Sequence, residues 1–351
     1  PDQVKLNQLL VGGSFGRRAN PKSDYLLEAV AIAKAINQGP TAGVPVKMLW
    51  TREDDMAGGY YRPLYVHRVS AGLDAQGKPL AWQQRIVGQS IAAGTPFEPM
   101  MVQNGVDVTS VEGAANLPYA IPNFQVELHS PRVGIPIQWW RSVGSTHTAF
   151  STETIVDDLA TLAGKDPVAF RTELLAKFPR HLGVMKLAAD KAGWGKPLAK
   201  GKPGQRRGRG IAVHESFHTF VAQVAEVTVS QDGSFTVDRV VCAVDCGIII
   251  NPDVVVAQME GGIGYGLSAA LSGAITLTNG EVDQSNFHDY PVLRLPEMPK
   301  VEVHTVSSTE NPTGVGEPAT PVIAPAVANA LFAATGKRLR KLPFQTSELK
   351  A

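Results

Sequence analysis

Residues 211–245 read IAVHESFHTFVAQVAEVTVSQDGSFTVDRVVCAVD. Small and β-branched apolar residues recur along 211–229 and again along 234–245, with a Gln-Asp-Gly turn signal at 231–233. The pattern predicts a hairpin of two long strands. The segment at 254–271 is rich in glycine and has the apolar spacing of a helix. Strands followed by helices in this way indicate an α+β fold, with helices packed on mixed sheets.

The rest of the chain continues this mixture. A helix is expected from Ser23 to the Gly-Pro pair at 39–40, and another after Asp166, which is suited to cap a helix that begins with proline. Residues 196–210 are rich in Lys, Arg, Gly and Pro and are expected to form a linker or exposed loop. Further helices are expected at 151–163 and 325–334, and strands at 4–11, 46–50, 65–72, 81–87 and 125–130.

Composition argues against several classes of protein. At 351 residues the chain exceeds what one hydrophobic core usually organises, so two or three domains are expected. Its 33 basic and 32 acidic residues give no electrostatic case for a nucleic-acid partner. Two cysteines, Cys242 and Cys246, are too few for an iron–sulfur cluster or a disulfide framework. The charged fraction of 19% is below the roughly 25% usual in soluble domains, which fits a large core or a covered surface.

Residues 214–218 match the HExxH pattern of zinc peptidases. The flanking residues, however, favour a strand, on which residues four apart lie roughly 13 Å from each other. His214 and His218 could not then share one zinc ion. We interpret them as strand residues.

Residues 12–16, Gly-Gly-Ser-Phe-Gly, follow the strand expected at 4–11. They match a nucleophile elbow with Ser14 as the nucleophile, although Pro21 disfavours the immediate helix that an elbow needs. Glycines would also let backbone amides approach an anionic or oxo-bearing ligand, which Phe15 could cover. A tight turn without a ligand is the third interpretation.

Three other segments carry side chains suited to chemistry. Glu317 stands between glycine and proline, where burial would raise its pKa and allow proton exchange near neutral pH; a plain turn glutamate is the alternative. Arg141 follows two tryptophans and suits an anion or a polarised oxygen, or stacking for stability alone. Gln258 opens the glycine-rich part of the helix at 254–271, where a partner helix or a ligand is expected to come close.

Taken in order, these segments resemble the molybdenum-binding subunit of the xanthine dehydrogenase family of molybdenum hydroxylases. Within that family the chain is most similar to the isoquinoline 1-oxidoreductase beta subunit and to bacterial aldehyde dehydrogenase large subunits. No single segment is decisive, but their joint order is specific. The segments that carry the resemblance are 12–18, 50–56, 140–144, 157–160, 166–167, 244–252, 258–267, 284–290, 314–318 and 324–336.

The resemblance implies an oxidoreductase that hydroxylates an aldehyde or an N-heteroaromatic carbon with oxygen from water. Glu317 matches the family's base, which takes a proton from hydroxide at the metal, and Arg141 would lie near the metal and polarise the substrate. The metal would be held by molybdopterin cytosine dinucleotide and not by protein ligands. The implied cofactor-binding residues are Gly13, Ser14, Phe15, Gly16, Arg17, Ser142, Gln258 and Gly316.

The resemblance also implies partners and a domain division. Residues 1–195 and 211–351 would form parts of two molybdenum cofactor-binding regions, the second of which carries Glu317. The family's Met-Gly-Gln-Gly type segment is missing and the chain is about half the usual length. We therefore expect a C-terminal half, encoded separately or cleaved, that packs on an N-terminal half or companion chain. The [2Fe–2S] clusters are expected on a small partner subunit, and a cytochrome c or flavin subunit is a further expected partner. A non-catalytic assembly half is the competing hypothesis.

Overall fold

The computed structural model describes residue 2 and residues 4–350. A four-stranded sheet with strand order β11-β8-β7-β6 organises the larger core. Its first three strands in the chain are antiparallel neighbours, and the last joins β8 in parallel. These strands are β6 (Arg206–Ser216), β7 (Thr219–Val229), β8 (Phe235–Asp245) and β11 (Lys300–Thr305). The hairpin about 231–233 is confirmed as the pair β7 and β8.

The prediction of a single strand over 211–229 was wrong, because the chain reverses inside this stretch. Phe217 and His218 both have left-handed backbone, with φ of 54° and 61°, and β6 and β7 pair from Ser216 and Thr219 onward. Two-residue hairpin turns of this kind usually contain Asn-Gly or Asp-Gly. Phe-His therefore gave no turn signal. Because of the reversal, His214 lies on β6 and His218 lies in the turn. No group of residues suited to a metal ion occurs in the described part of the chain.

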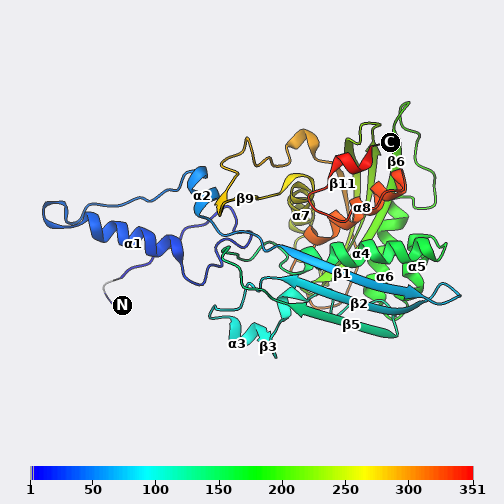
Figure 1. Ribbon diagram of the computed structural model, residues 1–351, viewed down its shortest axis with the longest axis horizontal. Helices are drawn as coiled ribbons and strands as arrows, with labels where there is room; N and C mark the ends of the chain where they lie inside the picture. The colour runs from blue at the N-terminus through cyan, green and yellow to red at the C-terminus, as the bar shows by residue number, and fades with distance from the viewer. Residues whose placement is uncertain (1, 3, 351) are drawn as a thin grey trace.

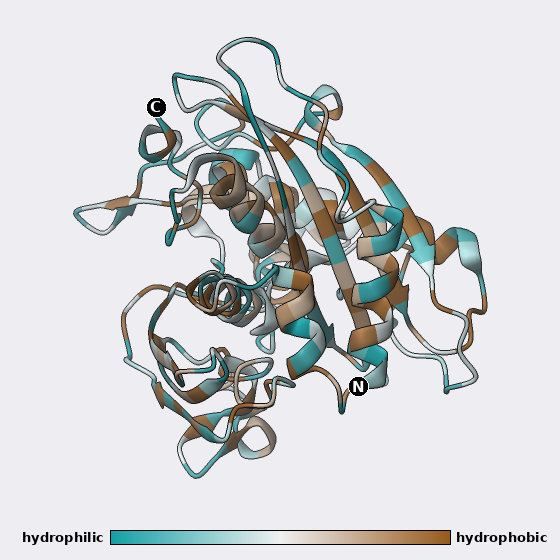
Figure 2. Cartoon of the chain, turned by 90° about the vertical axis from the view of Figure 1, so that its right-hand side faces the viewer, coloured by the Kyte–Doolittle hydropathy of each residue, from teal (hydrophilic) through white to brown (hydrophobic). Residues whose placement is uncertain are grey.

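Side chains of β6, β7 and β8 alternate between two layers of helices, so both faces of the sheet are buried. In Figure 2 hydrophobic and polar residues alternate along these long strands. Helices α7 (Pro252–Ser272) and α8 (Thr320–Thr335) cover one face. The other face packs on α4 (Ser145–Leu162), α5 (Pro167–Leu174) and α6 (Pro179–Lys191).

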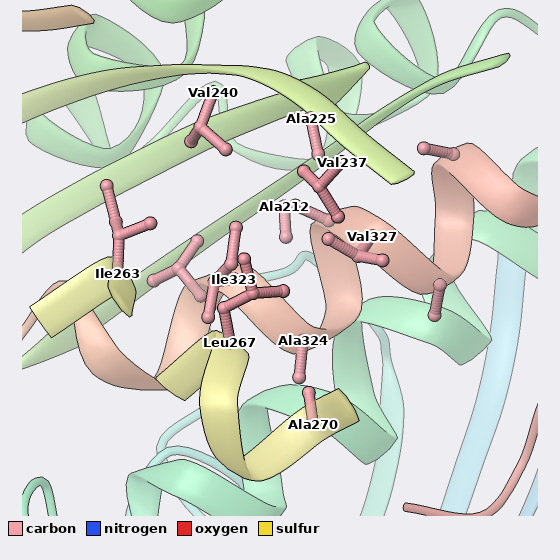
Figure 3. Packing of buried hydrophobic residues seen from close by; sticks show 14 of the residues in the cluster. Ala212, Ala225, Val237, Val240, Ile263, Leu267, Ala270, Ile323, Ala324 and Val327 are labelled. Atoms are coloured by element: carbon pink, nitrogen blue, oxygen red, sulfur yellow. The ribbon is translucent and has the colours of Figure 1, made fainter. Parts of the chain in front are cut away.

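The face under α7 and α8 holds a dry core of aliphatic side chains (Figure 3). Each large aliphatic side chain buried there contributes roughly 1.5–3 kcal/mol of hydrophobic stabilisation. Glycines let α8 approach β6 closely: a Cβ at Gly210 would lie 2.1 Å from the backbone nitrogen of Ala330. Fully buried members of this core include Ala212, Val240, Ile263, Leu267, Ile323 and Val327.

A second, three-stranded sheet packs beside α4 (Figure 1). Its order is β1-β2-β5, with the first pair antiparallel and the second parallel. The strands predicted at 65–72, 81–87 and 125–130 are confirmed as β1 (Tyr65–Leu73), β2 (Pro79–Gly88) and β5 (Asn123–His129). The short elements are β3 (Val102–Gln103), β4 (Val106–Asp107), β9 (Leu277–Thr278), β10 (Glu281–Val282), α2 (Arg52–Gly58) and α3 (Glu98–Met101).

The predicted helices are confirmed, and two of them begin earlier than expected. α4 starts at Ser145, six residues before the expected start, and α8 starts at Thr320, five residues before it. The Asp166 side chain caps α5 by accepting from two backbone N–H groups, as predicted. Residues 206–210 belong to β6, whereas 196–205 form no helix or strand. No helix of the described chain has the length and apolarity of a membrane span.

Residues 4–50 form an arm, most of which projects from the body of the molecule (Figure 1). The arm contains α1 (Asp24–Ile36), a confirmed helix with no buried residue. The strands predicted at 4–11 and 46–50 were wrong, because these segments form no ladder with a neighbouring strand in the described chain. The arm therefore exposes an apolar surface.

Candidate active site

The candidate site is built around the turn that leads into α4. Ser142 and Val143 have left-handed backbone, with φ of 75° and 48°, which costs on the order of 1 kcal/mol or more for each such residue. The turn directs the backbone N–H of Ser142 to Oε1 of Glu317, at 2.9 Å. The next position, 144, requires glycine, because a Cβ there would lie 1.8 Å from the carbonyl oxygen of Thr109. Strain in the turn is thus coupled to the placement of Glu317.

Arg141 connects this turn to two other segments. Its Nε donates to the carbonyl oxygen of Gly316 at 2.7 Å, and its Nη2 donates to Oε1 of Gln258 at 3.0 Å. Burial lowers the pKa of the Arg141 guanidinium, which nevertheless stays charged. Arg141 forms no ion pair with a described residue. Neutral acceptors therefore hold a positive charge that a polarised or anionic ligand can use.

The glycine-rich turn at 12–16 lies against the same segment. The carbonyl oxygen of Phe15 accepts from the backbone N–H of Arg141 at 3.1 Å. Gly16 has φ of 104°, and a Cβ there would lie 2.1 Å from the carbonyl oxygen of Trp139. The Phe15 ring stacks on Tyr265 with centroids 5.2 Å apart, yet the residue is 50% exposed. This arrangement leaves an aromatic face open beside Arg141.

The glycines of α7 have a structural explanation in α8. A Cβ at Gly262 would lie 2.8 Å from that of Ala319, and one at Gly266 would lie 2.4 Å from the carbonyl oxygen of Thr320. The sequence predicted that either a partner helix or a ligand comes close to this helix. At Gly262 and Gly266 it is a partner helix. Gln258, the seventh residue of α7, and Gly316, four residues before α8, are both bonded to the Arg141 guanidinium.

Glu317 is partly exposed, so the expectation of a buried carboxylate is met only in part. One of its oxygens, Oε1, is held by Ser142, and Oε2 makes no hydrogen bond with any residue that the structure describes. Gly316 is exposed, with open space where a side chain would be. The carbonyl oxygen of Gly316 accepts from Arg141, so Arg141 adjoins the Glu317 segment.

Two of the predicted cofactor-binding residues direct their side chains elsewhere. Arg17 forms an ion pair with Asp24 of α1, at 2.7 Å. The Ser14 hydroxyl accepts from the backbone N–H of Arg18 at 3.3 Å and has no histidine as a hydrogen-bond partner in the described chain. The helix also begins only at Asp24. The serine-hydrolase interpretation therefore lacks both its base and its strand-to-helix turn. Gly13, with φ of 126°, lies in the turn under the Phe15 ring.

Sequence reasoning missed two residues of the site. Tyr265 stacks on Phe15 and lies under the guanidinium of Arg141, 5.7 Å from its ring centroid. Glu112 accepts through Oε1 from the backbone N–H groups of Gly144 at 2.8 Å and Ser145 at 3.3 Å. Burial raises the pKa of Glu112 to about 7, and the charge of Glu317 acts in the same direction. Tyr265 lies in the segment 258–267 that carries the family resemblance, whereas no sequence motif includes Glu112.

Unused polar atoms at the site fit a ligand that is rich in oxygen. The hydroxyl of Ser142 is buried and has no hydrogen-bond partner in the described chain. The Gln258 amide nitrogen likewise donates to no described residue, since only its oxygen is bonded to Arg141. Together with the Arg141 charge, these donors suit phosphate, pterin or oxo acceptors.

Models of two molybdopterin cofactor-binding domains match residues 1–175 and 180–299. The chain is 33% identical over 347 residues to the beta subunit of isoquinoline 1-oxidoreductase from Brevundimonas diminuta, covering 98% of this chain and 43% of that protein. The chain belongs to the xanthine dehydrogenase family of molybdenum-binding subunits. Another relative, the membrane-bound aldehyde dehydrogenase of Gluconacetobacter polyoxogenes, is 31% identical over 99% of this chain and 47% of its own length. The chain thus spans less than half of these relatives.

Solved structures of the family share the fold. Quinoline 2-oxidoreductase of Pseudomonas putida 86 superposes with a TM-score of 0.77 at 14% identity, over 96% of this chain and 67% of that one. Aldehyde oxidoreductase of Desulfovibrio gigas gives 0.76 at 15% identity, over 97% and 54%. The predicted α+β architecture of a molybdenum-binding subunit is therefore confirmed.

Proposed function

We propose that this chain forms part of a molybdenum hydroxylase that oxidises an aldehyde or an N-heteroaromatic ring carbon, with oxygen taken from water. The observation that carries the proposal is the convergence of Glu317, Arg141 and Gln258 through hydrogen bonds of 2.7 to 3.0 Å. These residues come from three segments, and each matches a family motif. The electrons would pass to [2Fe–2S] clusters on a partner subunit.

Each residue has a role that follows from its contacts. Glu317 is the base: Ser142 orients one carboxylate oxygen, and the other is free to take a proton from the attacking oxygen nucleophile. Arg141 polarises the electrophilic end of the substrate with a guanidinium charge that forms no ion pair with a described carboxylate. Phe15 and Tyr265 provide an aromatic wall for a flat substrate. The bound molybdopterin cofactor would supply the redox-active molybdenum that accepts the two electrons.

We further propose that the cofactor is the cytosine dinucleotide form, held by the glycine turn that contains Gly13 and Gly16, by the Ser142 hydroxyl and by the Gln258 amide. The unpartnered polar atoms of Ser142 and Gln258 support an oxygen-rich ligand at this place. The cytosine form is what the family resemblance implies. Gly316, Ser14 and Arg17 would contribute backbone groups. Nucleotide analysis of the purified complex tests the assignment: release of CMP on acid hydrolysis supports it, and release of no nucleotide contradicts it.

A companion polypeptide is proposed to complete the site. The apolar arm at 4–50 supports this partner, since α1 buries no residue within the chain. The companion would correspond to the part of the relatives that this chain does not span. A cytochrome c or flavin subunit is proposed as the next electron acceptor.

The Glu317→Gln variant tests the function. We expect turnover to fall by roughly 10²–10⁴-fold, because the amide cannot accept the proton, while molybdenum content stays that of the wild type. Turnover by the assembled complex and metal content by elemental analysis are measured together. Full activity in this variant would contradict the assignment. Absence of molybdenum from the wild-type complex would instead favour the non-catalytic assembly half.

A further inference from the structure

Glu112 contacts the same turn as Glu317 but at different backbone N–H groups. It precedes the loop to β5, and its Oε1 accepts from the backbone N–H groups of Gly144 at 2.8 Å and Ser145 at 3.3 Å. These are the first N–H groups of α4, which have no partner within their own helix. A carboxylate at this end of a helix also interacts favourably with the helix dipole. Glu112 therefore fixes where α4 begins.

The Glu112 segment is clamped to α4 by more than its carboxylate. The Thr148 hydroxyl donates to the carbonyl oxygen of Glu112 at 2.7 Å. Gly144 leaves room for the Glu112 side chain, since a Cβ at position 144 would lie 3.1 Å from Cγ of Glu112. The start of α4 can therefore move only if the Glu112 segment moves with it.

The same turn carries the bond that orients the base. Between Arg141 and Ser145, the N–H of Ser142 points to Glu317, that of Val143 to the carbonyl oxygen of Trp140, and those of Gly144 and Ser145 to Glu112. Ser142 and Val143 are left-handed, a conformation that persists only where surrounding contacts hold it. The carboxylate of Glu112 supplies such a contact on the helix side.

We propose that Glu112 is a positioning residue for the base: by anchoring the first turn of α4, it keeps the Ser142 N–H directed at Glu317. The inference rests on the proposed role of Glu317. The charged and titratable groups that face Glu112 are Glu317, Asp107 and Tyr65. Because Glu112 acts through hydrogen bonds that its side-chain oxygen accepts, an uncharged acceptor of the same shape should replace it.

Two substitutions distinguish a role of the hydrogen bonds that Glu112 accepts from a role of its negative charge. Near pH 6 the Glu112 carboxyl is largely protonated, since its pKa is about 7, so Glu112→Gln is then a matched neutral isostere. We expect Gln to retain kcat and Glu112→Ala to lower kcat by about 10- to 100-fold with little change in KM, because only the alignment of the base is lost. Asp232→Ala is the control, since Asp232 also accepts from a backbone N–H but lies in the turn between β7 and β8.

A second readout does not depend on turnover. Amide hydrogen exchange in residues 142–146 of the assembled protein should be about tenfold faster in Glu112→Ala than in the wild type, and near wild type in Glu112→Gln. Unchanged exchange in the Ala variant, or equal loss of kcat in Ala and Gln near pH 6, would overturn the proposal. If Glu317→Gln keeps full turnover, the proposed function fails, whereas faster exchange in Glu112→Ala would still establish the anchoring contact.

Discussion

Two glutamates divide the backbone N–H groups of one strained turn between them. Glu317 takes the N–H of Ser142, and Glu112 takes those of Gly144 and Ser145. Their surroundings differ: Glu317 has one oxygen free of described partners, whereas burial raises the pKa of Glu112 to about 7. This difference fits the proposed roles, proton transfer for Glu317 and positioning for Glu112.

At the residue scale, Glu112 predicts a pH dependence of stability. A carboxyl whose pKa is raised from 4.5 to about 7 holds its proton more tightly in the folded state, so it contributes stability at low pH that is lost as the pH rises through this interval. The loss amounts to at most about 3 kcal/mol. Thermal unfolding of wild type and Glu112→Gln from about pH 4.5 to 7.5 checks it: the wild type should lose stability relative to the variant. Parallel curves would contradict the shift.

At the scale of elements, the contact between α7 and α8 determines the site. Gln258 in α7 and Gly316 just before α8 bond to the same Arg141 side chain. The distance between the helices depends on glycines that face α8. The glycine spacing indicated a close approach, but the sequence left a helix and a ligand as alternatives. Only the packed structure shows that Gly262 and Gly266 contact α8.

Substitution of glycine by alanine should therefore change the free energy of unfolding differently at different positions of α7. Gly266→Ala would place Cβ 2.4 Å from the Thr320 carbonyl oxygen, so we expect destabilisation by about 1–3 kcal/mol. In Gly264→Ala the nearest atoms belong to the flexible side chain of Met298, at 3.3 Å, so this control should be neutral or gain up to about 1 kcal/mol of helix propensity. Chemical denaturation measures both free energies. Equal effects would contradict the packing argument.

At the scale of the whole molecule, the chain exposes more surface than its mass requires. Its solvent-accessible surface is 18735 Å², against roughly 13,700 Å² for a folded monomer of 37.4 kDa. The arm at 4–50 contributes to this excess, with Leu9 80% and Leu27 63% exposed. The low charged fraction of the sequence fits the same conclusion, because a covered surface needs fewer charges.

The arm predicts how assembly would fail. Leu27→Asp and Val30→Asp together should leave thermal unfolding of the chain within about 0.5 kcal/mol of wild type, because both side chains are exposed. They should nevertheless reduce recovery of the companion in a pull-down through this chain, since charges would enter the interface. Leu162→Asp, at an exposed position on α4, is the control. Unchanged recovery with the arm variant would argue against the arm as the binding surface.

Patterns among neighbouring residues of the sequence determined the helices and strands whose signals are local. The helices α1, α5 and α7, the strands β1, β2 and β5 and the hairpin turn before β8 followed from apolar spacing, capping residues and turns, because these signals act over a few residues. Strand β11 was not predicted. The segments at 4–11 and 46–50 look like strands but lack partners in the described chain, and the turn at Phe217 carries no turn residue. The sequence could also name Glu317, Arg141 and Gln258 through their motifs.

Tertiary structure alone decided which of these side chains meet. Phe15, Arg141, Gln258 and Glu317 are far apart in the chain, and hydrogen bonds bring them together only after α7, α8 and α4 have packed. It also showed that Arg17 turns toward α1, and it revealed Glu112 behind the catalytic turn. The physical reason is that contacts between distant segments depend on helix spacing and backbone strain, which no local pattern of residues records.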